Sequence, residues 1–283
     1  MVEGAGFFAA PPLAASLPMR TADLGKARIH YETVGRGPHV LLIPGFATNF
    51  HLFDGQVDAL SAKHTVTRYD LRGQGKSSAP AAGYSTQEHV GDLAGLMGHL
   101  GVTRAHLVGA SMGGAVAVRA ALEHPDLVAS LALAGAVVDG FSAWSDDFVQ
   151  RLRRARKLAQ SEGVAPALVD WKQHPFFGAT RDREAFFARV LEYSGAGWLD
   201  NTKPARAGPS DFDRLPQIKA PTLAVVGSRD VEACKVIARE VGQRVPGARF
   251  AEVAGAGHLV PWDAPDEFNR ALLGFLAGAE KRP

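Results

Sequence analysis

Short runs of apolar and β-branched residues alternate with amphipathic segments along most of the chain. Runs such as 39–43, 105–108 and 128–134 are almost wholly apolar and only five or so residues long, which is typical of buried strands. In the segments between them, apolar residues recur every three or four positions, as on one face of a helix. Strands that alternate with helices predict a doubly wound, mostly parallel sheet.

The pattern predicts eight strands and a helix in most of the intervals between them. The expected strands are 19–23, 28–32, 39–43, 65–69, 105–108, 128–134, 222–226 and 249–253, of which the first two form an antiparallel hairpin. The expected helices of this α/β part are 53–62, 85–100, 114–124, 232–244 and 265–277.

The alternation stops between about residues 139 and 213, where the pattern is helical only. Helices are expected at 144–161, 165–173 and 183–193, followed by a loop rich in Gly and Pro at 195–210. An all-helical block inserted after one strand predicts a cap over the carboxyl ends of the strands, where such sheets bind ligands. The expected domains are an arm at 1–18, an α/β core at 19–138 and 211–283, and a cap at 139–210.

Composition narrows the class of protein. The chain has 283 residues, 46% of them hydrophobic, and a net charge of +2, which gives no reason to expect nucleic acid or an anionic membrane as partner. A single cysteine excludes an internal disulfide framework and any multi-cysteine metal site. No apolar run reaches the roughly 18 residues that span a bilayer. Residues 1–18 hold no Lys or Arg, so we expect a cytoplasmic protein, with secretion left open.

The sequence Gly109-Ala110-Ser111-Met112-Gly113 lies between an expected strand and an expected helix. This order is typical of a nucleophile elbow, in which a strained turn projects the serine hydroxyl beyond the edge of the sheet. Glycines two residues before and after the serine let the strand and the helix approach closely. The alternative is a glycine-rich turn whose serine only caps a helix.

Two further candidate residues follow later strands. Asp230 comes shortly after the strand at 222–226, and His258 lies on the loop that leaves the strand at 249–253. The order serine, aspartate, histidine is the one expected for an elbow of this kind. We predict that His258 takes the proton of Ser111, while Asp230 orients the imidazole and stabilises its charged form.

Each of these residues also has a structural interpretation. Asp230 could be the N-cap of the helix at 232–244, and His258 could be an ordinary loop histidine. Asp139 is a competing acid, because it follows the strand at 128–134. Asp230 is favoured over it, since Asp230 leaves its strand on a short turn near the histidine loop.

Backbone N–H groups are expected to stabilise a developing oxyanion. The residue after the serine, Met112, and Phe46 in the turn after an earlier strand are the predicted donors. We expect Phe46 also to contact the substrate, together with Trp144, Trp171 and Trp262, in a largely apolar pocket.

Four motifs resemble those of the α/β-hydrolase superfamily: GASMGG at 109–114, DLRGQGKS at 70–77, GSRD at 227–230 and GH at 257–258. The resemblance extends over about residues 20–277, and is strongest to the capped esterases, enol-lactonases and cofactor-free haloperoxidases. It implies the α/β-hydrolase fold and a serine nucleophile. One departure is Pro44-Gly45, where these relatives usually carry His-Gly before the oxyanion residue.

Ser111 at the elbow favours acyl chemistry, since dehalogenases and epoxide hydrolases of this superfamily carry aspartate there. We therefore expect hydrolysis of carboxylic esters through an acyl-enzyme, with a small, largely apolar acyl substrate as partner. We expect no cofactor and no metal, and we expect Cys234 to be a free thiol without a catalytic role. Two alternatives stay open: the same triad acting on a lactone, an amide or a C–C bond, and a ligand-binding receptor with little turnover. The oligomeric state is left open.

Overall fold

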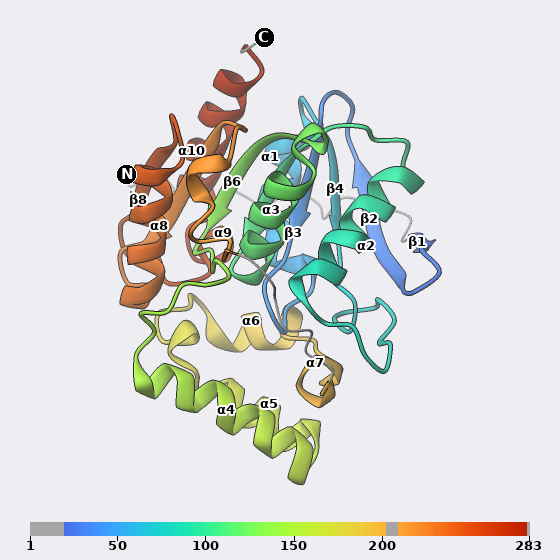
Figure 1. Cartoon of the computed structure of the whole chain (residues 1–283), viewed down its shortest axis with the longest axis vertical. Helices are drawn as coiled ribbons and strands as arrows, with labels where there is room; N and C mark the ends of the chain where they lie inside the picture. Colours follow the sequence, from blue (N-terminus) through green and yellow to red (C-terminus); the bar gives the residue numbers. More distant parts are fainter. Residues whose placement is uncertain (1–19, 202–208, 282–283) are drawn as a thin grey trace, which may run out of the picture.

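The computed structural model describes residues 20–201 and 209–281. The arm expected at 1–18 lies outside the described residues, as does part of the loop expected at 195–210. The described chain forms one eight-stranded sheet with helices on both faces and a further group of helices at one edge (Figure 1).

The sheet contains the eight predicted strands, and most of them run parallel, as predicted. Its strands are β1 (Arg20–Asp23), β2 (Arg28–Val34), β3 (His39–Ile43), β4 (Thr65–Tyr69), β5 (Ala105–Ala110), β6 (Val128–Ala134), β7 (Thr222–Gly227) and β8 (Arg249–Val253). Their spatial order is β1-β2-β4-β3-β5-β6-β7-β8. β1 and β2 form an antiparallel hairpin, β2 pairs antiparallel with β4, and all pairs from β4 to β8 are parallel. The doubly wound fold is confirmed.

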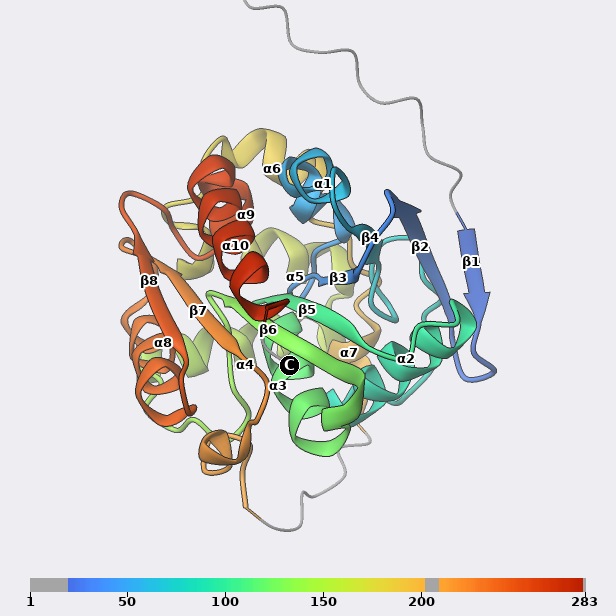
Figure 2. The same ribbon diagram turned by 90° about the horizontal axis from the view of Figure 1, so that it is seen from above.

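Helices cover both faces of this sheet because its central strands are apolar on both sides. Every residue of β5 and β7 is buried. One face packs against α2 (Thr86–His99), α3 (Met112–Glu123) and α8 (Glu232–Arg244), and the other against α1 (Asp54–Ser61) and α10 (Pro265–Ala279) (Figure 2). Short 3-10 helices at Phe50–Phe53, Pro125–Leu127 and Leu215–Gln217 join some of these elements. In the described part of the chain no helix is long and apolar enough to cross a membrane.

The helix boundaries follow the capping residues of the sequence. The Ser85 side chain accepts a hydrogen bond from the Glu88 N–H at the start of α2, as a capping box requires. Ser145 does the same for the Phe148 N–H at the start of α4 (Asp146–Ser161). These side chains satisfy N–H groups that a helix leaves without internal acceptors, so the helices begin there.

Between β6 and β7 the chain forms helices only. These are α4, α5 (Val164–Trp171), a 3-10 helix at Pro175–Phe177, α6 (Arg183–Arg189) and α7 (Ala196–Leu199). Figure 1 shows them gathered at one edge of the sheet. Residues that follow β3, β5, β6 and β8 line a cavity together with residues of α4 and α5, so these helices cover the carboxyl ends of the strands.

Three segments between β6 and α10 differ most from the prediction. The helix predicted at 183–193 ends at Arg189, because Leu191 and Tyr193 form isolated β-bridges with Thr48 and Gln74 of the core. α7 lies in a segment predicted to be a loop. The short helix α9 (Val260–Asp263) follows His258 and was not predicted. In the first of these, contacts between distant segments override a weak local preference.

Candidate active site

The turn between β5 and α3 consists of one residue, Ser111. The strand extends to Ala110 and the helix begins at Met112, so the turn is tighter than the five-residue turn predicted from the sequence. Ser111 has φ 52° and ψ −118°, a region that residues other than glycine rarely occupy and that costs about 1–3 kcal/mol. Its backbone is held by hydrogen bonds from the Ser111 N–H to the Ala134 carbonyl (3.0 Å) and from the Val137 N–H to the Ser111 carbonyl (3.1 Å).

Two glycines make this tight turn possible. A Cβ atom on Gly109 would lie 2.3 Å from the Gly113 carbonyl oxygen, and one on Gly113 would lie 2.1 Å from the Ile43 carbonyl oxygen. The absence of both side chains therefore lets α3 start directly against the ends of β5 and β3. The spacing Gly-x-Ser-x-Gly is a packing requirement of the elbow.

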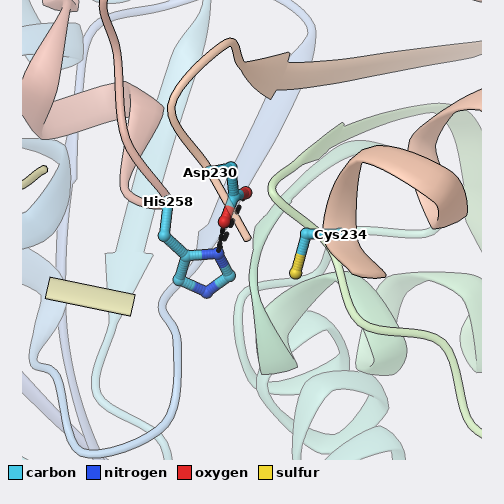
Figure 3. Close-up of side chains that lie close together, drawn as sticks. All are labelled: Asp230, Cys234 and His258. Carbon is cyan, nitrogen blue, oxygen red and sulfur yellow. Dashed lines mark hydrogen bonds and ion pairs between the residues drawn. The ribbon is translucent and has the colours of Figure 1, made fainter. Parts of the chain in front are cut away.

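The structure brings Ser111, His258 and Asp230 together in a hydrogen-bonded chain. The His258 Nε2 atom lies 2.9 Å from Ser111 Oγ, and His258 Nδ1 lies 3.0 and 3.1 Å from the two carboxylate oxygens of Asp230. Figure 3 shows the contact between His258 and Asp230. All three residues are buried. Asp230 accepts a hydrogen bond from the Nδ1–H of His258, which leaves the Nε2 lone pair free to accept the serine proton.

A second buried carboxylate supports the loop that carries His258. Asp263, the last residue of α9, accepts hydrogen bonds from the Gly257 N–H (3.0 Å) and the Arg181 N–H (2.9 Å). Burial raises the pKa of Asp263, and these two N–H donors partly offset that increase. Asp263 thus links the histidine loop to the segment before α6. Asp263 was not predicted from the sequence, where its signal was its position five residues after His258.

An aromatic ring covers one face of His258. The Phe176 ring, from the 3-10 helix at Pro175–Phe177, stacks on the imidazole with the ring centroids 3.7 Å apart and the planes at 8°. His174 packs edge to face on the neighbouring Phe148 ring, and it is neutral at pH 7. Burial, and secondarily the nearby His258, lowers the pKa of His174 to about 3. Phe176 and the neighbouring His174 therefore bring no charge to this face of His258.

The predicted oxyanion donors lie beside Ser111. Met112 is the first residue of α3, and the first N–H groups of a helix have no acceptor within it. Phe46 follows Gly45, whose position is so close to Ser111 that an added Cβ would lie 3.1 Å from the serine Cβ. Within the described part of the chain, neither the Met112 nor the Phe46 N–H donates to a protein acceptor. Both groups are available to a ligand atom.

A cavity of about 320 Å³ opens above Ser111 and His258. This volume is at the lower end of the range of about 300–1,000 Å³ that is typical of small-molecule sites. Most of its lining is apolar, including the predicted residues Phe46, Trp144 and Trp171.

Trp262, the fourth predicted substrate contact, does not line this cavity. Its ring packs against Phe186 with the centroids 5.5 Å apart, and its Nε1 donates to the Arg181 carbonyl (2.8 Å). The short helix α9 directs Trp262 toward α6 and away from Ser111. The prediction for Trp262 was therefore wrong for this cavity.

Asp139, the competing acid of the sequence analysis, lines the cavity but does not contact His258. Its Oδ2 accepts hydrogen bonds from Thr86 Oγ1 (2.7 Å) and from a guanidinium nitrogen of Arg119 (2.9 Å). No Lys or Arg is among the described residues that line the cavity. Asp139 is thus the one carboxylate in that lining.

A possible metal site is formed by three neighbouring side chains, those of Asp230, Cys234 and His258 (Figure 3). Their potential ligand atoms lie within 4.8 Å of one another. However, Asp230 and His258 already satisfy each other, and burial, with the Asp230 charge second, raises the pKa of the Cys234 thiol well above its ordinary value. A protonated thiol is a poor metal ligand, so these residues fit a hydrogen-bonded pair beside a buried cysteine better than a metal centre.

Comparisons with known proteins agree with this fold. Residues 38–265 match the profile of the family described as "alpha/beta hydrolase fold". The 2-hydroxy-6-oxononadienedioate/2-hydroxy-6-oxononatrienedioate hydrolase of Burkholderia vietnamiensis is 33% identical over 275 residues, which cover 90% of this chain and 92% of that protein. A putative carbamate hydrolase RutD of Azorhizobium caulinodans is 29% identical over 268 residues, 91% of this chain and 98% of that protein.

Solved structures lead to the same family. The enol-lactonase from Burkholderia xenovorans superposes with a TM-score of 0.74 at 28% identity, over 91% of this chain and all of that one (100%). The chain belongs to the α/β-hydrolase family, and the relatives named here are hydrolases. The resemblance inferred from the four sequence motifs is thereby confirmed.

Proposed function

We propose that the protein hydrolyses carboxylic esters through an acyl-enzyme intermediate, with Ser111 as nucleophile. The observation that carries the proposal is the hydrogen-bonded chain from Asp230 through His258 to Ser111, at the floor of a largely apolar cavity. Family membership supports a hydrolase, and the geometry supports the choice of residues.

In the first half of the reaction, Ser111 Oγ attacks the ester carbonyl while His258 Nε2 takes the serine proton. Asp230 keeps the imidazole in the required tautomer and stabilises its positive charge. The N–H groups of Phe46 and Met112 stabilise the negative charge that develops on the carbonyl oxygen. His258 then gives its proton to the leaving alkoxide, so an alcohol departs and the acyl group stays on Ser111.

In the second half, a water molecule takes the place of the alcohol. His258 accepts a proton from this water as it attacks the acyl carbonyl, and the same two N–H groups stabilise the second tetrahedral intermediate. When the bond to Ser111 breaks, His258 returns the proton to Ser111 Oγ. The carboxylic acid leaves and the free enzyme is restored.

The charge of the residues that line the cavity helps to choose among the candidate substrates. The relative from Burkholderia vietnamiensis is named for hydrolysis of a dioate, a substrate with two carboxylates. The described lining here offers no Lys or Arg and includes Asp139, which disfavours an anionic substrate. This supports a carbonyl compound that carries no negative charge. A lactone is such a compound, so lactone hydrolysis is the second candidate, in keeping with the likeness to an enol-lactonase.

The test is a kinetic comparison of wild-type protein and Ser111→Ala on p-nitrophenyl esters, simple lactones, anilides and a β-diketone. We expect kcat/KM to be highest on esters or lactones, and Ser111→Ala to lower it at least about 10³-fold, because a triad without its nucleophile forms no acyl-enzyme. Ester hydrolysis at the wild-type rate by Ser111→Ala would contradict the proposal.

Covalent labelling separates an enzyme from a receptor. We expect a fluorophosphonate to label the wild-type protein at Ser111 and to leave Ser111→Ala unlabelled. Labelling of Ser111 together with no turnover of any compound in the panel would favour a ligand-binding protein that retains the triad.

A further inference from the structure

Asp139 presents a carboxylate oxygen that no described group satisfies. Both of its described hydrogen bonds, from Thr86 and Arg119, go to Oδ2. Among the described residues none donates to Oδ1, and 38% of the side-chain surface is exposed. Asp139 lines the cavity above Ser111. One oxygen is therefore anchored and the other is left for water or a ligand.

Arg119 pairs with Asp139 through the Oδ2 side of the carboxylate. The same guanidinium group also pairs with Asp211 at 2.8 Å, and Arg214 lies 3.8 Å from the other oxygen of Asp211, so two arginines face these two carboxylates. No Lys or Arg contributes to the described lining of the cavity, in which Asp139 is the one carboxylate. Next to its Oδ1, a cation or a neutral hydrogen-bond donor is therefore favoured over an anion.

Asp139 takes no part in the hydrogen-bonded chain of the triad. It makes no hydrogen bond with Ser111 or His258 in the described structure. It lines the same cavity as these two residues. A group that contacts Asp139 therefore belongs to a part of a bound substrate other than its reacting carbonyl.

We propose that Asp139 forms a recognition subsite for a hydrogen-bond donor, a hydroxyl or an ammonium group, at the distal end of the acyl substrate. This inference rests on the proposed ester hydrolysis, and it makes Asp139 a determinant of specificity. The bonds from Thr86 and Arg119 hold the carboxylate in place, so Oδ1 accepts the donor without a large loss of side-chain freedom. The rest of the acyl chain contacts apolar side chains such as Val138 and Phe141.

The test uses p-nitrophenyl esters of equal length that differ in their terminal group: hexanoate, 6-hydroxyhexanoate, 6-aminohexanoate and adipate. We expect wild-type kcat/KM for the 6-amino and 6-hydroxy esters to exceed that for the adipate monoester about 10- to 100-fold, the usual effect of one hydrogen bond to a charged group. In Asp139→Asn the ratio of 6-amino to adipate ester should fall to within about threefold of one, because the amide carries no charge. The 6-hydroxy ester should keep its advantage, since an amide oxygen still accepts a hydrogen bond.

Asp126→Asn is the matched control, because Asp126 is exposed on the 3-10 helix Pro125–Leu127, outside the cavity lining. It makes the same change in net charge, and we expect it to keep the wild-type ratio. A ratio in Asp139→Asn equal to that of the wild type, or a wild-type preference for the adipate ester, would overturn the proposal.

A binding measurement keeps this test separate from the proposed chemistry. Calorimetry on Ser111→Ala with n-hexylammonium requires no turnover, and we expect the added change Asp139→Asn to weaken its binding at least about tenfold. Unchanged binding of n-hexylammonium in the double variant overturns the subsite even if esters are hydrolysed. Weaker binding in the double variant supports the subsite even if the wild-type protein hydrolyses none of the esters, a result that would contradict only the proposed function.

Discussion

Phe176 and His258 stack face to face, although they come from distant parts of the chain and from different parts of the fold. Phe176 belongs to the helical segment between β6 and β7, and His258 to the loop after β8. A ring in contact with one face of the imidazole restricts its rotation and keeps water from that face. We infer that this contact helps to hold Nε2 in line with Ser111 Oγ, which is the geometry that proton transfer requires.

At the scale of the residue, the prediction is that Phe176→Leu lowers kcat about two- to tenfold on a short ester such as p-nitrophenyl acetate. This loss of kcat corresponds to the roughly 0.5–1.5 kcal/mol that an aromatic pair contributes beyond its buried area. KM should change less than kcat, because a short acyl group has little contact with this ring. Steady-state kinetics measures both constants.

The matched control is Phe187→Leu. Phe187 packs edge to face with Phe177 and lies beneath the charged ends of Lys172 and Arg183, and no described contact joins it to His258. We expect its kcat to remain close to that of the wild type. An equal loss of kcat in both variants would mean that the effect is a general loosening of this segment.

At the scale of the element, the junction of β5 and α3 is closely packed. The helix begins one residue after the strand ends, and Gly113 faces the carbonyl oxygen at the end of β3. A side chain here would have to push α3 away from the sheet, since the obstructing atoms belong to the backbone of Ile43 and Pro44. The position of Ser111 therefore depends on how closely two elements approach.

We predict that Gly113→Ala destabilises the protein by about 1–3 kcal/mol, the usual cost of overpacking, and also lowers kcat. Urea unfolding measures the free energy, and activity on the same sample measures the displacement of Ser111. Gly91→Ala in α2 is the control, because an added Cβ there meets nothing within 4 Å. It should be neutral or stabilise the protein by up to about 1 kcal/mol. Full stability and activity in Gly113→Ala would show that α3 can shift freely.

At the scale of the whole molecule, Asp54 connects the α/β core to the helices over the sheet edge. It lies at the start of α1, where its Oδ2 accepts a hydrogen bond from Arg189 of α6 (2.6 Å). Its Oδ1 accepts one from Arg68 of the core and lies 2.9 Å from His51 Nδ1. Partial burial would raise the pKa of Asp54, but the hydrogen bonds from His51, Arg189 and Arg68 and the charge of Arg68 outweigh it. The pKa is held well below its ordinary value.

A lowered pKa predicts stability that depends on pH. The contribution of Asp54 is present above the pKa that it has in the unfolded chain, and it is lost as the pH falls toward the lower pKa of the folded state. We expect Asp54→Asn to destabilise the protein by about 1–2 kcal/mol at pH 7, after allowance for partial exposure to solvent. The difference from the wild type should shrink as the pH is lowered from 5 toward 3, as measured by urea unfolding.

Asp58→Asn on the same helix is the control, because Asp58 is exposed and its carboxylate makes no hydrogen bond or ion pair with the described residues. We expect it to change stability by less than about 0.5 kcal/mol at either pH. If the free energy of unfolding of Asp54→Asn fell further below that of the wild type as the pH is lowered, the role assigned to Asp54 would be contradicted.

Most of the sheet was predictable from local pattern alone. The strands at 39–43, 65–69, 128–134 and 249–253 have the bounds that the sequence predicts. Buried parallel strands are short apolar runs between turn residues, so composition marks both of their ends. The helix at 183–193 was predicted too long, because its last residues pair with core segments far away in sequence.

The meeting of Ser111, Asp230 and His258 was also predictable, since each follows a strand and parallel strands carry their carboxyl ends to the same edge. What only the tertiary structure decided is which side chains surround them. Phe176 covers His258, Asp263 supports its loop, Trp262 turns away, and Asp139 faces the cavity. The physical reason is that these residues lie in irregular turns and short helices. Their direction is set by long-range packing, which no local period of the sequence records.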